Sequence, residues 1–384
     1  MIFLQLAGII SAMKELIREI RTAKDVAFPK EGRRLALMEG PTNCNRDCSY
    51  CTVPQRWDSK KTSTLDQCRT QVNWLYDQGY RILNYFGGEP LSPHLKTKED
   101  ITFADHTLGI VRHAAEKGMR VNVTTNGDFV TEEVLDDLHN AGLDMLTLSL
   151  HTLTNAGVSH LMKGAHMAAE RKIVPDVNVV FTNDRVLVIP QIAVLCAQNG
   201  ILFSTSVVQE YGGGFSSVPE QSKIPTPEQQ RDVFSRLLFL KRAGFIRNNT
   251  NYLEDAPEFP GNSWKCDPEQ DSFVHVHSEG EGEIGVCLEV RTGFQIGDTQ
   301  LDSEQWRSAK RDLVEGCHDC LYNATFGTQN PNMRGDIPTL INMFLIRSGH
   351  ARLVEIRGIK AVARQKKQEG YSPHEETTGN IFTR

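Results

Sequence analysis

From residue 35 onward, short apolar runs alternate with amphipathic helical patterns, and this alternation limits the possible folds more than any other feature. Strand–helix alternation is typical of parallel sheets with crossover helices. Several predicted helices end at a glycine (Gly79, Gly118 and Gly200), as helix C-termini often do. The six repeats therefore predict an α/β fold, an open (βα)6 barrel. The predicted strands are Leu35–Met38, Ile82–Phe86, Val121–Thr125, Met145–Leu150, Val177–Phe181 and Leu202–Val208. The predicted helices are Leu65–Gln78, Phe103–Lys117, Thr131–Asn140, Ala156–Arg171 and Leu187–Asn199.

Three cysteines follow the first predicted strand with the spacing C-x3-C-x2-C: Cys44, Cys48 and Cys51. Reactive groups of such barrels lie at the carboxyl ends of the strands. Thiolates this close can converge on one centre, and three thiolates on a four-iron cluster leave one iron open to bind a cofactor. Unrelated or zinc-bound cysteines are the alternative, although a structural zinc usually takes four protein ligands.

A second motif, Gly87-Gly88-Glu89-Pro90, follows the second strand. Its glycines let the backbone pass close to a ligand, and its carboxylate can accept from an ammonium group. Together the two motifs resemble the radical S-adenosylmethionine (SAM) superfamily. The resemblance implies that the three cysteines hold a 4Fe–4S cluster whose open iron takes the amino and carboxylate groups of SAM. It also implies that Tyr50 packs against the adenine, and that the SAM amino group is bound by Gly87, Gly88, Glu89 and Pro90.

Further candidates for SAM contact lie where the third and fourth strands end. Asn126 precedes Gly127 at the end of strand three, where the pair could also form a simple turn. Ser149 and His151 share one face at the end of strand four. Many radical SAM proteins have an acid where this chain has His151. His151 is therefore either a donor to SAM or substrate, or a core histidine with satisfied hydrogen bonds.

Four more cysteines follow in the second half of the chain: Cys266, Cys287, Cys317 and Cys320. Their layout resembles the twitch form of the SPASM-type C-terminal domains. The resemblance implies an auxiliary 4Fe–4S cluster, with residues 273–277 and the turn at Gly280–Gly282 forming a hairpin between the first two ligands. Because four thiolates also complete a tetrahedral site, structural zinc is the alternative.

The net charge, the cysteine count and the N-terminal residues indicate which partners the protein binds and in which cellular compartment it lies. The net charge of −6 argues against general nucleic-acid binding. The nine cysteines are odd in number and clustered, and no secretory signal is recognised, so a reducing, cytoplasmic compartment is predicted. Residues 1–24 form an amphipathic pattern with trailing basic residues, which predicts a packed helix or a helix on a membrane surface.

The sequence predicts five segments. These segments are an N-terminal amphipathic helix (1–30), a radical SAM partial barrel (31–210), a linker loop and helix (211–262), a twitch-like auxiliary cluster domain (263–330), and a basic C-terminal extension with a partly disordered tail (331–384).

The resemblance implies reductive cleavage of SAM to methionine and a 5′-deoxyadenosyl radical, which takes hydrogen from an unactivated carbon of a small-molecule or peptide substrate. It also implies a flavodoxin- or ferredoxin-type electron donor. A looser resemblance to the adenosylhopene synthase branch gives an alternative, in which the radical adds to a polyisoprenoid lipid. A non-catalytic zinc-binding scaffold is the alternative from a different class.

Overall fold

The computed structural model describes residues 32–40, 42–48, 50–51, 63–208, 223–258, 266–277, 282–287, 291–315, 323–329 and 333–368. Several predictions lie outside these residues. They concern the N-terminal helix (1–30), the first part of the linker loop (211–222), Cys317 and Cys320, and the end of the C-terminal tail (369–384).

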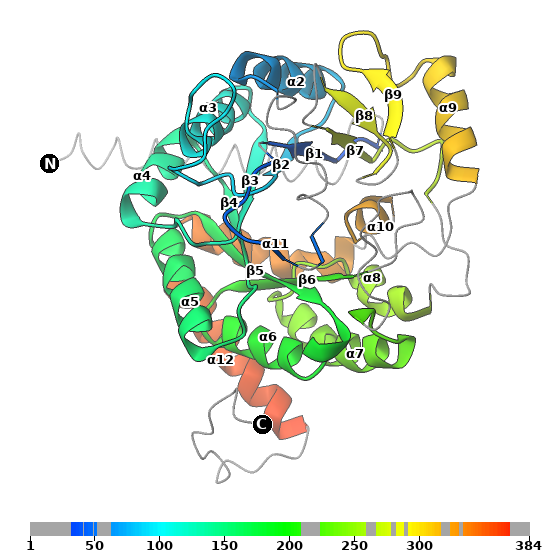
Figure 1. The fold of residues 1–384 in the computed structure, drawn as a ribbon. Helices are drawn as coiled ribbons and strands as arrows, with labels where there is room; N and C mark the ends of the chain where they lie inside the picture. The colour runs from blue at the N-terminus through cyan, green and yellow to red at the C-terminus, as the bar shows by residue number, and fades with distance from the viewer. Residues whose placement is uncertain are drawn as a thin grey trace, which may run out of the picture.

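The six predicted strands form a parallel sheet in chain order, and the fold class predicted from the alternation is confirmed (Figure 1). Parallel strands joined through helices place all their carboxyl ends at one edge. Each boundary agrees with the sequence prediction to within a few residues. The strands are β1 Leu35–Glu39, β2 Ile82–Phe86, β3 Arg120–Thr125, β4 Met145–Ser149, β5 Val174–Phe181 and β6 Leu202–Val207.

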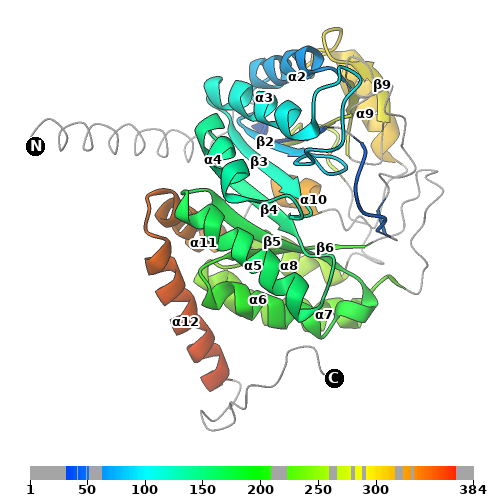
Figure 2. The ribbon, with the colours of Figure 1, turned by 60° about the vertical axis from the view of Figure 1, so that its left-hand side comes forward.

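The crossover helices lie on the outer face of the curved sheet (Figures 1 and 2). Threonine caps many of them: Thr64, Thr102, Thr131 and Thr154 each accept a hydrogen bond from the backbone N–H three residues on. Glycines at positive φ follow several helices, as the sequence predicted for Gly79, Gly118 and Gly200. The helices are α2 Leu65–Asp77, α3 Phe103–Glu116, α4 Glu132–Ala141, α5 Asn155–Glu170, α6 Val188–Gln198 and α7 Pro227–Ala243.

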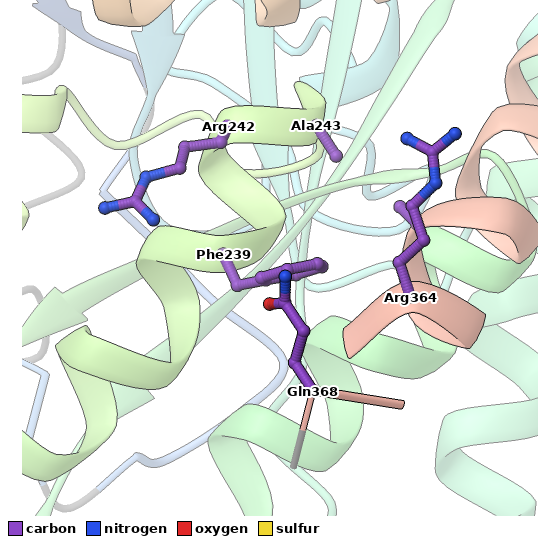
Figure 3. A pocket seen from close by; sticks show the side chains of 6 residues that line it. Phe239, Arg242, Ala243, Arg364 and Gln368 are labelled. Carbon is purple, nitrogen blue, oxygen red and sulfur yellow. The ribbon is translucent and has the colours of Figure 1, made fainter. Parts of the chain in front are cut away.

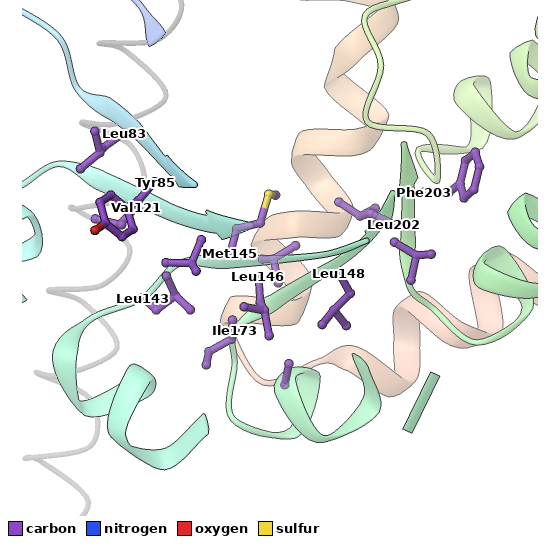
Figure 4. Packing of buried hydrophobic residues seen from close by; sticks show 14 of the residues in the cluster. Leu83, Tyr85, Val121, Leu143, Met145, Leu146, Leu148, Ile173, Leu202 and Phe203 are labelled. Atoms are coloured by element: carbon purple, nitrogen blue, oxygen red, sulfur yellow. The ribbon is translucent and has the colours of Figure 1, made fainter. Parts of the chain in front are cut away.

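The two faces of the sheet differ in chemistry. Apolar side chains such as Leu83, Val121 and Leu146 are fully buried and form the core (Figure 4). The opposite face carries a polar network: the Thr147 hydroxyl lies 3.1 Å from Asn122 Oδ1 and 3.2 Å from Asp176 Oδ2. An interior lined in this way suits a polar ligand better than an apolar one.

Three further strands extend the same sheet past β1: β7 Phe273–Val276, β8 Glu283–Gly285 and β9 Arg291–Gln295. β7 pairs in parallel with β1, and β8 pairs antiparallel with β7 as the predicted hairpin. The region predicted as a separate domain from residue 263 is thus joined to the barrel through backbone hydrogen bonds. Short helices follow or precede it in the chain: α8 Thr250–Asp255, α9 Glu304–Glu315 and α10 Asn323–Gln329.

Two C-terminal helices pack on the barrel where the sequence predicted a basic extension: α11 Met333–Arg347 and α12 Ala351–Gln368. Asn342 of α11 donates to the carbonyl of Gly244 at 3.0 Å, and Arg347 pairs with Asp144 just before β4. α11 therefore lies at the amino-terminal ends of the strands. α12 lies against α6 so closely that a Cβ at Gly358 would collide with the carbonyl of Ala197.

A pocket of about 290 Å³ lies between α7 and α12 (Figure 3). Phe239, Arg242 and Arg364 line it, with Ala243, Ala361 and Gln368. Because it is formed by the C-terminal ends of these outer helices, it is remote from the edge where the cysteine motif follows β1. In the part of the chain that the structure describes, helices long and apolar enough to cross a membrane are absent.

Candidate active site

The cysteine loop, residues 40–51, leaves β1 at the carboxyl edge of the sheet. Its described residues include the half-buried thiols of Cys44, Cys48 and Cys51. A backbone bond from Cys51 N–H to Cys48 C=O, 2.9 Å long, forms a turn between two of them. Burial raises the pKa of the Cys44 and Cys48 thiols, and the neighbouring Cys44 raises that of Cys48 further. Deprotonated thiols here are therefore favoured by a bound cation such as iron.

The Gly87-Gly88-Glu89-Pro90 turn lies directly against this loop. Glu89 N–H donates to the carbonyl of Asn43 at 2.8 Å. A Cβ on Gly88 would collide with the same Asn43 peptide, so glycine is needed here for the close approach of two backbones. Pro90 is buried and its carbonyl accepts from Thr107 at 2.7 Å. The turn fixes the height of the cysteine loop above the sheet.

The Glu89 carboxylate is fully buried and connects β2 to the end of β3. It accepts from the Thr125 hydroxyl at 2.6 Å, from Asn126 N–H at 2.8 Å and from Leu91 N–H at 3.0 Å. Burial raises its pKa, while these hydrogen bonds oppose the shift. A carboxylate can accept about four hydrogen bonds, so these three donors leave room for one more.

Polar contacts from β3 hold the cysteine loop from the other side. The Asn126 amide donates to Asn45 Oδ1 at 2.8 Å and lies 3.9 Å from Cys44 Sγ. Asp128 accepts from Asn45 at 2.9 Å and from Arg46 Nε at 2.8 Å. The Arg46 hydrogen bonds lower the pKa of Asp128. The sequence prediction included Asn126 but missed Arg46 and Asp128, because their pairing across 82 positions has no local pattern.

Tyr50 and His151 meet beside Cys48. The Tyr50 hydroxyl lies 2.8 Å from His151 Nδ1, which is also 3.4 Å from Cys48 Sγ. Arg185 lies over the Tyr50 ring, 5.4 Å from its centroid, and donates to the carbonyl of His151 at 3.2 Å. Burial raises the pKa of Tyr50 to about 12 and lowers that of His151 to about 4. Both rings are therefore neutral near pH 7. His151 is at the cysteine loop rather than in the apolar core.

Ser149 ends β4 and aligns with Asn178 of β5. Asn178 in turn donates to the hydroxyl of Ser204 on β6 at 2.9 Å. Ser149 is thus at the same edge of the sheet as the other candidates. The structure gathers all the described SAM-site candidates there: Tyr50, Gly87, Gly88, Glu89, Pro90, Asn126, Ser149 and His151.

The auxiliary cysteines are described only in part. Cys266 is buried against Val286 and Val314. Cys287 is half-buried, and its carbonyl accepts from His275 Nδ1 at 3.3 Å. Both flank the β7–β8 hairpin, as predicted. Cys317 and Cys320 lie in a stretch outside the described residues, between α9 and α10.

Comparisons with known proteins agree with this geometry. Residues 38–174 match the Radical SAM superfamily. A segment of 138 residues is 27% identical to the PqqA peptide cyclase of Bradyrhizobium diazoefficiens, covering 36% of this chain and 33% of the relative. This chain thus matches about a third of that relative's length.

Solved structures share the fold over more of the chain. Streptococcus suis SuiB bound to its precursor peptide SuiA aligns with a TM-score of 0.53 at 15% identity, covering 77% of this chain and 70% of SuiB. Native anSMEcpe with bound AdoMet and the Cp18Cys peptide aligns with a TM-score of 0.52 at 13% identity, covering 81% of this chain and 98% of that protein. The cysteine loop and the glycine–glutamate turn both fall within residues 38–174, so the chain carries a radical SAM domain.

Proposed function

We propose that this protein reductively cleaves SAM and uses the resulting radical to modify a peptide. The observation that carries the proposal is the convergence of the cysteine loop, buried Glu89 and Asn126 at one edge of the sheet. The superfamily match to residues 38–174 spans all of these residues.

The donor set fits a 4Fe–4S cluster held by three protein ligands. Cys44, Cys48 and Cys51 are half-buried thiols on one loop, and a bound iron cation would stabilise their deprotonated form. A cluster held there would supply one electron for the reductive cleavage of SAM to methionine and a 5′-deoxyadenosyl radical, which would take hydrogen from an unactivated carbon of the substrate.

The chain's own residues would bind SAM and orient it. The remaining acceptor capacity of Glu89 suits the SAM ammonium group, with the backbone of Gly87 and Gly88 alongside. Tyr50 offers a ring face to the adenine, and Asn126, Ser149 and His151 offer polar atoms at the same edge. The neutral state of His151 avoids a further positive charge beside the sulfonium of SAM.

A peptide is the substrate class that the comparisons support best. The PqqA peptide cyclase is similar in sequence, and SuiB, whose structure holds its precursor peptide, is similar in fold. An extended peptide would fit a barrel mouth whose interior is polar, since its backbone needs hydrogen-bond partners. A flavodoxin- or ferredoxin-type protein would supply the electron.

The proposal includes an auxiliary 4Fe–4S cluster on Cys266, Cys287, Cys317 and Cys320. The position of Cys266 and Cys287 around the β7–β8 hairpin supports it. Iron analysis of the reconstituted protein should give about eight iron atoms per chain, and about four in the Cys317→Ala/Cys320→Ala variant. Zinc in place of the second four irons would identify a structural metal site instead.

The experiment that tests the function uses anaerobically reconstituted protein with dithionite and SAM. Release of 5′-deoxyadenosine is expected, and a candidate peptide should gain a mass change that depends on SAM. A colourless zinc protein that leaves SAM intact would instead indicate a binding scaffold. An adenosylated polyisoprenoid as the product would indicate the adenosylhopene synthase branch and would overturn the peptide assignment.

A separate experiment, sedimentation with liposomes, tests whether residues 1–24 contact a membrane. Residues 1–24 were predicted as an amphipathic helix, and we propose that a lipid substrate would require them to bind vesicles. A 1–24 deletion should then lose sedimentation with anionic liposomes. For a peptide substrate, sedimentation in low salt is not expected in either form, in keeping with a cytoplasmic location.

A further inference from the structure

A second cluster of ligand-type side chains lies inside the barrel, next to the cysteine loop. Glu39 is the last residue of β1, and His275 and His277 follow on the adjacent β7 and just past its end. Their ligand atoms lie within 4.8 Å of one another. His275 Nε2 is 3.7 Å from Glu39 Oε1, and His277 Nδ1 is 3.5 Å from Glu39 Oε2.

Strand pairing explains why the three side chains meet. His275 aligns with Leu37 of β1, so His275 and His277, two residues apart, share a face with Leu37 and Glu39. Leu37 also aligns with Asn84 of β2, which belongs to the polar network inside the barrel. The three side chains therefore lie on the inner face of the sheet, toward the interior of the barrel.

All three side chains are buried: the two histidines have no exposed surface and Glu39 is 5% exposed at its side chain. Among the described residues, both ring nitrogens of His277 lack a hydrogen-bond partner. A buried imidazole without partners costs free energy, about 1–3 kcal/mol for each unsatisfied group. The distance of 3.5 Å to Glu39 is also long for a hydrogen bond.

A metal ion bound by the three side chains would give His277 the partner that it lacks among the described residues. Two imidazole nitrogens and one carboxylate are ligands that zinc takes at about 2.0–2.2 Å. Ligands bound at that length in a tetrahedral site lie about 3.3–3.6 Å apart, near the two separations found here. Three protein ligands leave a fourth position open, as in catalytic rather than structural zinc sites.

We propose that Glu39, His275 and His277 bind a divalent transition metal of the zinc class. This site uses none of the cysteines, and it lies next to the cysteine loop and to Cys287. Glu39 is followed directly by the cysteine loop, and His275 contacts the carbonyl of Cys287. Phe86, which precedes the glycine–glutamate turn, stacks on His275 with ring centroids 5.7 Å apart. The open position of the metal would take water or an oxygen of a bound ligand.

The test counts metals in the holoprotein. Reconstituted wild type is equilibrated with Zn²⁺, desalted, and analysed for zinc and iron by mass spectrometry. We expect about one zinc per chain in addition to the cluster iron. His277→Gln and the nearly isosteric Glu39→Gln should each lose this zinc and keep the iron. His106→Gln is the matched control, since His106 is also fully buried but lies on α3, away from the cluster, and it should keep the zinc.

X-ray absorption at the zinc edge then identifies the ligands. Bonds of about 2.0–2.1 Å to nitrogen and oxygen are expected, whereas zinc taken up by vacant cysteine sites would show bonds of about 2.3 Å to sulfur. Zinc should also raise the melting temperature of wild type but not that of Glu39→Gln. Wild type without additional zinc, equal zinc in wild type and His277→Gln, or sulfur ligation would each overturn the proposal. If His277→Gln fails to fold, the zinc and iron content of Glu39→Gln alone tests the proposal.

Discussion

The two cysteine regions of this protein are held in place by charges of very different burial. At the cysteine loop, the side chains of Arg46 and Asp128 are 26% and 28% exposed. Beside the auxiliary cysteines, Asp271 and Lys310 are 2% and 3% exposed and 3.0 Å apart. Asp271 also pairs with Arg307 at 2.7 Å, and the indole of Trp306 donates to it at 3.1 Å.

The difference in burial predicts different roles for the two sets of charges. The partly exposed pair at the cysteine loop positions the loop, whereas the buried charges around Asp271 stabilise the fold. Exposed ion pairs contribute little to stability, because water screens them and side-chain entropy opposes them. A buried pair that loses one partner leaves an uncompensated charge and is costly. We therefore expect changes at the cysteine loop to affect function, and changes around Asp271 to affect folding.

The largest effect is expected from Cys48→Ala. Loss of one thiolate should remove the cluster and abolish release of 5′-deoxyadenosine, because three ligands are the minimum for this type of site. Cys68→Ala is the control, since Cys68 is buried in the hydrophobic core on α2 and is not one of the loop thiols. Measurement of 5′-deoxyadenosine with dithionite and SAM checks both. SAM cleavage at the wild-type rate by Cys48→Ala would contradict the assignment of the loop.

Asp271→Asn should be the most destabilising of the charge changes. It leaves Lys310 buried without a counter-charge, and we expect a loss of about 3–5 kcal/mol in the free energy of unfolding. Asp128→Asn, the counterpart at the cysteine loop, should cost about 1 kcal/mol or less. Urea unfolding of both variants measures the difference. Equal destabilisation would show that the two regions do not differ as described.

Glu89→Gln tests the cysteine-loop region without removing the cluster. The change removes the charge that is proposed to bind the SAM ammonium group, which is worth about 1.5–3 kcal/mol, or roughly a 10- to 150-fold weaker affinity. The single amide oxygen, placed where Glu89 Oε1 lies, can still accept from the Thr125 hydroxyl and from Leu91 N–H, whereas the hydrogen bond from Asn126 N–H to Oε2 is lost. SAM titration and the visible spectrum report binding and cluster separately. Loss of the cluster spectrum would mean that the main role of Glu89 is to support the loop.

The smallest effect concerns acid stability. Burial lowers the pKa of His151 to about 4, whereas an unfolded histidine titrates near 6.5. Between these values the unfolded chain binds more protons than the folded one, so stability should fall as the pH falls from 6.5 to 4. His151→Gln should reduce this loss by about 2 kcal/mol at pH 5. Urea midpoints at pH 7.5 and 5 measure it, with exposed His166→Gln as control. An unchanged pH dependence in His151→Gln would contradict the burial argument.

Local sequence determined the elements of the barrel. The alternation of apolar runs with amphipathic helical patterns and the glycines that end the helices are short-range signals, and they placed β1–β6 and α2–α6 to within a few residues. The cysteine spacing and the glycine–glutamate turn are equally local. The position of each after a strand was enough to predict that they would meet, since parallel strands share a carboxyl edge.

Contacts between segments that are distant in the chain could not be predicted from short-range sequence patterns. The pairing of Arg46 with Asp128, the addition of β7 beside β1 and the packing of α12 on α6 depend on partners far away in the chain. The cluster of Glu39, His275 and His277 joins residues more than 230 positions apart. Sequence by itself thus determined which chemical groups the strand ends carry. Only the tertiary structure decided which of them meet, because burial and charge pairing are settled by the whole fold rather than by neighbouring residues.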